Sequence, residues 1–146
     1  MKERNKLPIS VQLILEKENK ILLMKRKNTG YEDGKYSLPG GHVEANEEIR
    51  KALIREAKEE IGIDIDMQDV QFYKVMNRKV NKQQEYVDFI FKANHWTGEI
   101  TNEESNKCEE IIWVNKEKIP ENTLSFIPQM LENDKSTYLP YNWEES

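Results

Sequence analysis

The chain is poor in the residues that build disulfides and zinc sites. Among its 146 residues there is one cysteine, Cys108, and there are two histidines, His42 and His95. A single cysteine cannot form an internal disulfide, and two distant histidines with one cysteine do not have the ligand spacing of a Cys/His zinc site. We therefore expect a protein of a reducing compartment, the cytoplasm, in which Cys108 serves packing.

Long apolar runs and a basic excess are also missing. No stretch approaches the roughly 18 apolar residues of a membrane-spanning helix. The best one, Val11 to Leu15, contains Gln12 and is followed directly by Glu16. The basic first residues lack the apolar segment of a secretion signal. Twenty-seven acidic residues against 22 basic ones give a net charge of −5, whereas duplex-binding proteins usually carry a basic excess. We expect neither a membrane nor a nucleic acid duplex as partner.

Hydrophobic periodicity and chain breakers predict strands, a helix, more strands and a second helix. Strands are expected at 9–16 and 20–25 as a hairpin and at 70–76, 85–93 and 109–114, and helices at 47–61, with acids in its first turn, and from 127 to 131. Gly62 is a natural stop for the first helix, and the glycines and prolines between 26 and 41 predict a long functional loop. This order favours an α/β fold of the layered α+β kind, a mixed sheet between helices. With no repeat or linker, we expect residues 1–146 to form one domain.

Three glutamates share one face of the first predicted helix. At about 100° per residue, Glu56, Glu59 and Glu60 fall within one arc beside the apolar stripe, with Arg55 on the outer side. Like charges three or four residues apart each cost a helix about 0.2–0.5 kcal/mol, and no lysine follows at positions 63 or 64. Clustered carboxylates suit hard divalent cations such as Mg²⁺ and Mn²⁺. The alternative is an ordinary solvated charged face.

The stretch from Gly41 to Ile63, GHVEANEEIRKALIREAKEEIGI, resembles the signature box of the Nudix hydrolases. That box reads Gly, five residues, Glu, seven residues, Arg-Glu, an aliphatic residue, any residue, Glu-Glu, any residue, Gly and an aliphatic residue. The matching positions are Gly41, Glu47, Arg55, Glu56, Glu59, Glu60, Gly62 and Ile63. Two departures touch no carboxylate: Ala57 replaces a larger aliphatic residue, and Asn46 stands where many members have Gly.

The resemblance implies a Nudix-type fold and metal-dependent hydrolysis of a diphosphate bond in a nucleoside diphosphate linked to a group X. Carried over to this chain, Glu56 and Glu60 would be the principal ligands of Mg²⁺ or Mn²⁺. Glu59 would be a further ligand or would hold a coordinated water, and the Gly40 carbonyl would complete the set.

Two further roles follow from the same resemblance. Arg55 would anchor Glu47 and so fix the loop against the helix, rather than touch the substrate. Some members use another acid from a loop after the box, and Glu104 is the expected one here. The other candidates are Glu103, Glu109 and Glu85, and the alternative is an acidic loop without a role.

The substrate is less well defined than the reaction. No proline lies between Gly41 and Ile119, which speaks against the ADP-ribose subclass, and Val80 and Asn81 stand where the dinucleoside polyphosphate subclass tends to have Tyr. The best interpretation is a (d)NTP pyrophosphohydrolase that releases NMP and pyrophosphate. The alternatives are a pyrophosphatase of nucleotide sugars or other nucleoside diphosphate derivatives, a catalytically silent nucleotide-sensing module, and a protein whose acidic helix only binds a partner.

The expected partner is a small-molecule nucleotide, and a homodimer is left open. His42, beside the glycine turn, is a candidate phosphate contact, as are Arg26 and Lys35; each is alternatively an ordinary loop residue. Aromatic side chains are candidates for stacking on a base, although aromatics dominate protein interiors and a core position is the expected one. They are Trp96, Trp113, Tyr36, Tyr86 and Phe89.

Overall fold

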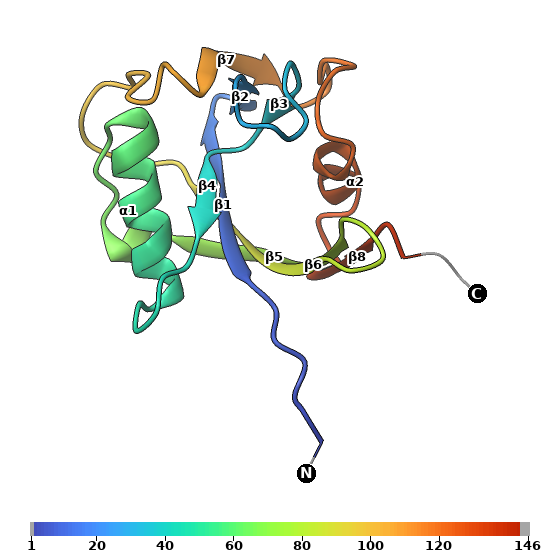
Figure 1. Cartoon of the computed structure of the whole chain (residues 1–146). Coiled ribbons are helices and arrows are strands. Elements are labelled where there is room, and N and C mark those ends of the chain that lie inside the picture. The colour runs from blue at the N-terminus through green and yellow to red at the C-terminus, as the bar shows by residue number, and fades with distance from the viewer. Residues whose placement is uncertain (1, 144–146) are drawn as a thin grey trace.

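The computed structural model describes residues 2–143 and contains eight strands and two α-helices. They are β1 (Ile9–Lys17), β2 (Lys20–Arg26), β3 (Tyr36–Ser37), β4 (Gly40–His42), α1 (Ile49–Ile61), β5 (Gln71–Lys79), β6 (Glu85–Ala93), β7 (Cys108–Asn115), α2 (Phe126–Glu132) and β8 (Tyr138–Tyr141), with a 3₁₀ turn at Met67–Asp69. The strand order is β3-β2-β1-β6-β5-β8, with β4 also on β1 and β7 also on β2. The pairs β1–β6 and β5–β8 are parallel and the others antiparallel. Figure 1 shows α1 and α2 on opposite sides of the strands, which confirms the predicted mixed sheet between helices.

Strand β1 is central because both of its faces are apolar. Val11, Leu13 and Leu15 belong to the core that contains α1, whereas Ile14 belongs to the core that contains α2. Successive side chains of a strand point to opposite faces, so a strand with a core on each side becomes a continuous apolar run. Toward α2 the alternation includes two polar residues, Ser10 and Gln12, and this polar end of the face matters for the site below.

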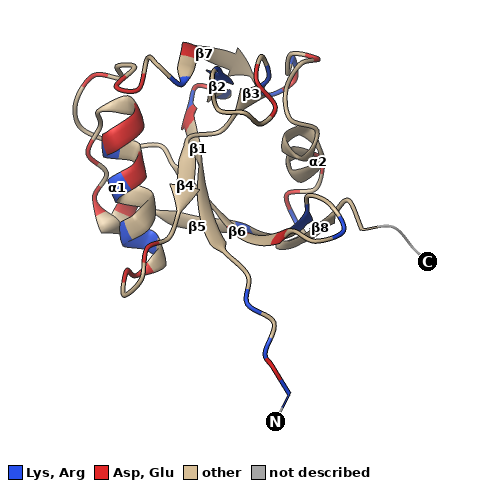
Figure 2. Cartoon of the chain, viewed as in Figure 1, with Lys and Arg blue, Asp and Glu red and all other residues tan. Residues whose placement is uncertain are grey.

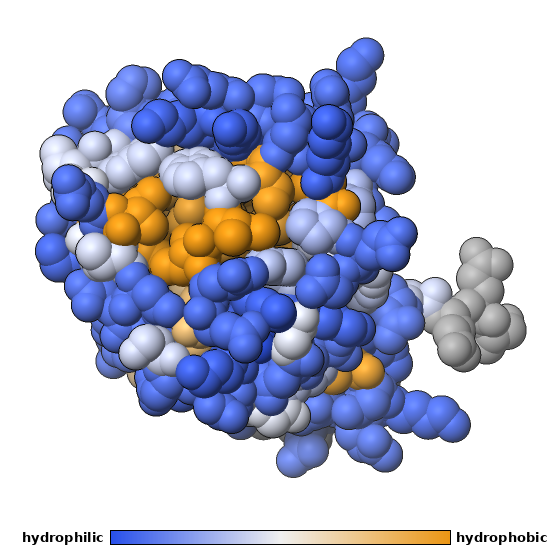
Figure 3. Space-filling view, turned by 90° about the horizontal axis from the view of Figure 1, so that it is seen from above, coloured by the Kyte–Doolittle hydropathy of each residue, from blue (hydrophilic) through white to orange (hydrophobic). Residues whose placement is uncertain are grey.

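Each helix covers one of the two cores. Helix α1 buries Ala52, Leu53, Ala57 and Ile61, and α2 buries Phe126, Ile127 and Met130. Within residues 2–143, no helix is both long and apolar enough to cross a membrane. Figure 3 shows the molecule from above, where hydrophobic residues form one patch on the surface and hydrophilic residues surround it.

The glycine after α1 ends the helix as predicted, but the start lies two residues later than predicted. Glu48 is the N-cap, and its carboxylate accepts hydrogen bonds from the backbone N–H groups of Arg50 and Lys51. The prediction of acids in the first turn was therefore wrong, since Glu47 and Glu48 precede the helix. Because Glu47 is outside the helix, its side chain is free to turn back toward α1.

The predicted hairpin and the three later strands are present, with ends shifted by up to three residues. Sequence reasoning missed β3, β4 and β8, which are short or broken by proline and glycine. Most of the candidate aromatics pack as expected: Tyr36 is buried, and Phe89, Trp96 and Trp113 pack against the core of α1.

Alanine at Gly62 should lower the free energy of unfolding by roughly 1–2 kcal/mol, the cost of a left-handed conformation for a residue with a side chain. Gly62 has φ 73°, and a Cβ there would lie 2.6 Å from Thr101 Oγ1. Gly34→Ala is the matched control, because Gly34 has φ 86° and nothing within 4 Å of an added Cβ. Urea denaturation should show the larger loss for Gly62→Ala, and equal losses would show that the Thr101 contact costs nothing.

Candidate active site

Two glycines of β4 bring the backbone of the loop against the glutamates of α1. A Cβ on Gly41 would lie 2.4 Å from the Glu56 carboxyl carbon, so this carboxylate packs directly on the Gly41 backbone. The Gly40 N–H donates a hydrogen bond of 2.8 Å to Glu60 Oε1. On the other side, a Cβ on Gly40 would lie 2.1 Å from the carbonyl oxygen of Val11. Only glycine fits at position 40, because the Val11 backbone leaves no room for a side chain, whereas a side chain at position 41 would displace the Glu56 carboxylate.

Arg55 ties the loop before α1 to the helix. Its Nε and Nη2 donate to the two Glu47 carboxylate oxygens at 2.7 and 3.0 Å, and Nη2 also donates to the His42 carbonyl oxygen at 3.0 Å. The contact between Arg55 and Glu47 that the box implies is therefore present. Hydrogen bonds from Arg55 lower the pKa of Glu47 to about 2, so Glu47 is ionised at neutral pH.

The same arginine offsets part of the charge on α1. Arg55 Nη1 donates to Glu56 Oε1 at 2.8 Å and to Glu59 Oε2 at 3.2 Å. Helical periodicity places Arg55 beside the glutamates on the outer side, and its long side chain contacts both of them. In Figure 2, acidic and basic segments alternate along α1. Glu60 is the glutamate of this face for which no hydrogen bond from Arg55 is found in the described chain.

Glu60 and Glu56 are the two carboxyl groups of this face whose ionisation is disfavoured in the absence of a cation. Burial, followed by the charges of Glu56 and Glu104, holds the pKa of Glu60 well above its usual range, and the Gly40 N–H opposes this only in part. Burial also raises the pKa of Glu56, against the lowering effect of Arg55. A cation placed between these carboxylates would relieve the repulsion.

These residues fit a hard divalent cation. The fit is one of donor chemistry, because among residues 2–143 no group of three or more acidic, histidine or cysteine side chains is placed so that it could hold a metal ion. The donors are nevertheless all oxygens, as Mg²⁺ and Mn²⁺ prefer. They line one cavity of about 510 Å³, which we call the carboxylate cavity: Gly40, Glu56, Glu59, Glu60 and Glu104, with Lys25, Arg26, His42 and Lys107 also on its walls.

Of the four candidate loop acids, the structure brings Glu104 to the carboxylate cavity. Glu103 instead accepts a hydrogen bond from Thr101, Glu109 pairs with Lys25, and Glu85 pairs with Lys79. The Glu104 backbone is held by two neighbours of its own loop, since its N–H donates to Asn102 Oδ1 and its carbonyl accepts from the Lys107 N–H.

A second cavity of about 440 Å³ adjoins the first, with walls from β1, β5, β6 and α2. We call it the Arg78 cavity. Arg26, His42 and the two glycines of β4 line both cavities, so two of the predicted substrate contacts lie where the cavities meet. Lys35 is placed elsewhere: its amino group pairs with Glu32 at 2.6 Å beside a different, smaller cavity.

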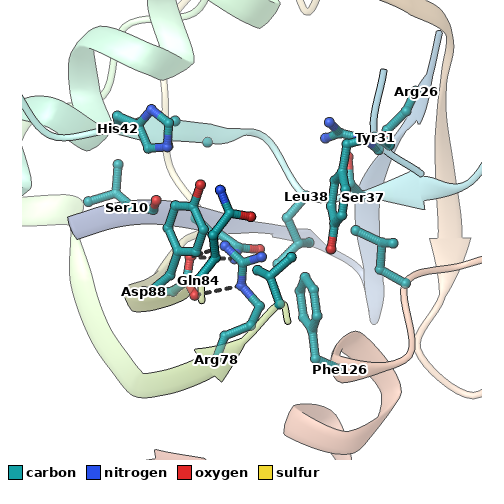
Figure 4. Close-up of a pocket in the computed structure, with 17 residues that line it drawn as sticks. Ser10, Arg26, Tyr31, Ser37, Leu38, His42, Arg78, Gln84, Asp88 and Phe126 are labelled. Carbon is teal, nitrogen blue, oxygen red and sulfur yellow. Dashed lines mark hydrogen bonds and ion pairs between the residues drawn. The ribbon is translucent and has the colours of Figure 1, made fainter. Parts of the chain in front are cut away.

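An ion pair in the Arg78 cavity was missed by sequence reasoning. Arg78 on β5 donates to both carboxylate oxygens of Asp88 on β6, at 2.8 and 3.1 Å (Figure 4). Burial tends to lower the pKa of Arg78, but the hydrogen bonds to Asp88 raise it, so the guanidinium stays charged. The available signal was Asp88 itself, because it is a charged residue on the same strand face as Tyr86 and Ile90. Tyr86 also lines this cavity and stacks on His42, with ring centroids 5.8 Å apart.

The comparison with family models agrees with this geometry, since the model of the NUDIX domain matches residues 6–134. The chain belongs to the NUDIX family. Its β4 turn and α1 are the turn and helix of the signature box, and the carboxylate cavity lies between them.

Known NUDIX proteins resemble this one in sequence and fold. An 8-oxo-dGTP diphosphatase from Proteus vulgaris is 30% identical over 111 residues, 74% of this chain and 93% of that relative. An ADP-ribose pyrophosphatase from Methanocaldococcus jannaschii is 51% identical over 55 residues, which are 38% of this chain and only 32% of that relative. The crystal structure of a MutT NUDIX hydrolase from Burkholderia pseudomallei has the same fold, with a TM-score of 0.80 at 24% identity over 90% of this chain and 100% of that one.

Replacing Glu47 by Gln should destabilise this NUDIX domain at neutral pH but not in acid. The pKa of Glu47 falls on folding, from 4.5 to about 2, so the folded state binds fewer protons. The stabilisation is complete above pH 4.5 and is lost as the pH falls through about 2. Urea midpoints of the wild type and Glu47→Gln should therefore converge over this range.

The control for this prediction is Glu44→Gln. Glu44 approaches the same arginine only to 3.7 Å, with 68% of its side chain exposed, and exposed pairs contribute little. A loss as large as that of Glu47→Gln, or a difference that does not depend on pH, would contradict the assigned role of the Arg55–Glu47 pair.

Proposed function

We propose that this chain is a (d)NTP pyrophosphohydrolase that cleaves a nucleoside triphosphate to a nucleoside monophosphate and pyrophosphate. The observation that carries the proposal is the junction of the two cavities at the β4 turn. One cavity gathers carboxylates that suit a divalent cation, and the other is of a size to take a nucleoside. The similarity to the 8-oxo-dGTP diphosphatase, which extends over most of both chains, supports this substrate class.

A diphosphate resists hydrolysis because its negative oxygens repel an incoming nucleophile. Bound Mg²⁺ or Mn²⁺ supplies charge neutralisation and lowers the pKa of water at the site. We assign the holding of this cation to Glu56, Glu60 and the Gly40 carbonyl, with Glu59 and Glu104 as further oxygen donors. Arg55 acts as a positioning residue, since it binds the loop through Glu47 and the His42 carbonyl rather than reaching into either cavity.

Basic groups of the carboxylate cavity complete the environment for a phosphate chain. Lys107 and Arg26 line this cavity together with the acids. Arg26 is held by its own loop, since its Nε donates to the Tyr31 carbonyl at 2.8 Å and its Nη2 to Thr29 Oγ1 at 3.2 Å. We infer that these groups bind phosphate oxygens that the cation leaves exposed.

A nucleoside diphosphate derivative is the second candidate substrate. The similarity to the ADP-ribose pyrophosphatase favours it, although this match is confined to about a third of that relative. A silent sensing module is the weaker alternative, because all the glutamates of the box are present.

The test is a panel of (d)NTPs, nucleotide sugars and ADP-ribose with Mg²⁺, read by product identity. We expect a monophosphate and pyrophosphate from at least one triphosphate. Glu56→Gln combined with Glu60→Gln should reduce the rate roughly a thousandfold or more while leaving the far-UV circular dichroism unchanged, because a lost metal ligand removes charge stabilisation and not core packing. Full activity in this double variant would refute the metal assignment, and products only from a sugar derivative would favour the second candidate.

Glu104 and Glu103 offer a matched pair of loop substitutions. Glu104→Gln should reduce kcat and Mn²⁺ affinity by roughly 10–100-fold, as expected for a residue that supports a metal site. Glu103→Gln should change neither, because Glu103 bonds to Thr101 and does not line the carboxylate cavity. Steady-state kinetics and calorimetry of both variants check this, and similar behaviour of the two would remove Glu104 from the site.

A further inference from the structure

The Arg78 cavity contains a charged pair that is almost completely buried. The Asp88 side chain is 0% exposed and that of Arg78 is 12% exposed. Asp88 Oδ1 accepts a second hydrogen bond, from Gln12 Nε2 at 3.2 Å. A buried ion pair is often no more stabilising than well-packed apolar residues of the same volume. Stabilisation of the β5–β6 pair therefore does not by itself explain why Arg78 and Asp88 are buried here.

The Arg78 guanidinium is fixed in place by more than its salt bridge. It lies over the Tyr86 ring, with its carbon 4.5 Å from the ring centroid, and 5.8 Å from the centroid of Phe126 on α2. Tyr86 is directly opposite Arg78 in the β5–β6 register, and Asp88 is the next residue on the same face. A planar guanidinium held by a carboxylate and an aromatic face has one orientation.

In this orientation, some donors of Arg78 have no partner. Asp88 takes hydrogen bonds from Nε and Nη2, and within residues 2–143 no hydrogen bond from Nη1 is found. Figure 4 shows the guanidinium reaching into the middle of the cavity, between Gln84 and Leu38. An arginine has five N–H groups and no acceptor, and Nη1 is not among the fully buried unpartnered atoms of the described chain, so it faces the open cavity. A ligand that fills the cavity and covers this N–H must offer an acceptor, because a donor that is buried without a partner is costly. A ligand bound in this cavity should therefore place a hydrogen-bond acceptor opposite Arg78.

We propose that Arg78 selects the base of the substrate by donating a hydrogen bond to a ring carbonyl oxygen, so that 6-oxopurine nucleotides are preferred over 6-aminopurine nucleotides. This inference rests on the proposed function, which places the phosphates in the adjoining carboxylate cavity. An amino group in the place of the carbonyl oxygen would direct its own N–H toward the guanidinium and leave both without an acceptor. Sites built to bond one polar group discriminate strongly against analogues that lack it.

The test compares inosine and adenosine nucleotides, which differ at position 6 and in the proton on N1. A hydrogen bond to a charged group predicts that kcat/KM for ITP exceeds that for ATP by roughly 10-fold or more. Arg78→Met should bring this ratio close to one, mainly by lowering the value for ITP. Calorimetric binding of IMP and AMP to the same proteins should show the same loss of preference without any need for hydrolysis.

Two further variants separate base selection from folding. Arg78→Gln combined with Asp88→Asn leaves no unpaired buried charge and should also lose the preference. Lys79→Gln is the matched control on the neighbouring position of β5, since Lys79 pairs with Glu85 and does not line the Arg78 cavity. It should keep the wild-type ratio.

Each outcome bears on one proposal or the other. If the Arg78 variants lower kcat/KM for ITP and ATP by the same factor, Arg78 has only a structural role and base selection is overturned. Hydrolysis of ITP and ATP at equal rates by the wild type overturns base selection alone and leaves the proposed function intact. Conversely, an Arg78-dependent preference for IMP in a protein that hydrolyses no triphosphate supports base selection and refutes the hydrolysis.

Discussion

The site depends on the close approach of the β4 backbone to the carboxylates of α1. The Gly41 backbone touches the Glu56 carboxylate, and the Gly40 N–H binds Glu60 while the rest of Gly40 lies against β1. Strand β4 is fixed in turn by its pairing with β1, whose core packing holds both helices. A shift of β4 by even a methyl group's width would separate the turn from the helix, so the sheet sets the geometry of the carboxylate cavity.

Charge within the site is balanced unequally. Arg55 bonds to Glu47, Glu56 and Glu59, whereas Glu60 receives only a backbone N–H among the bonds described for it. The arginine thus stabilises the framework of loop and helix without neutralising the centre. Under the proposed function, a divalent cation at that centre would allow the buried carboxylates to be ionised together.

The grouping of the glutamates at the candidate site could be predicted from the sequence because it depends on local spacing. Helical periodicity places Glu56, Glu59 and Glu60 on one face, and Gly62 ends the helix in both prediction and structure. The pair of Arg78 and Asp88 could not be predicted, because it depends on the register between two strands and on which face of the sheet is left open. Lys35 shows the same limit, since a basic residue near the glycine turn in sequence points to Glu32 in space.

The division of one sheet face would let the proposed phosphate chemistry and the proposed base preference depend on different residues. On the face toward α2, the alternating residues are polar at one end (Ser10, Gln12 and Asp88) and apolar at the other (Ile14 and Ile90). Helix α2 is only seven residues long and packs on the apolar end. The polar end is therefore open as a cavity beside the β4 turn. Apart from the β4 turn, its walls come from segments outside the signature box, so changes in those segments would alter the proposed base preference without disturbing the carboxylates assigned to the diphosphate.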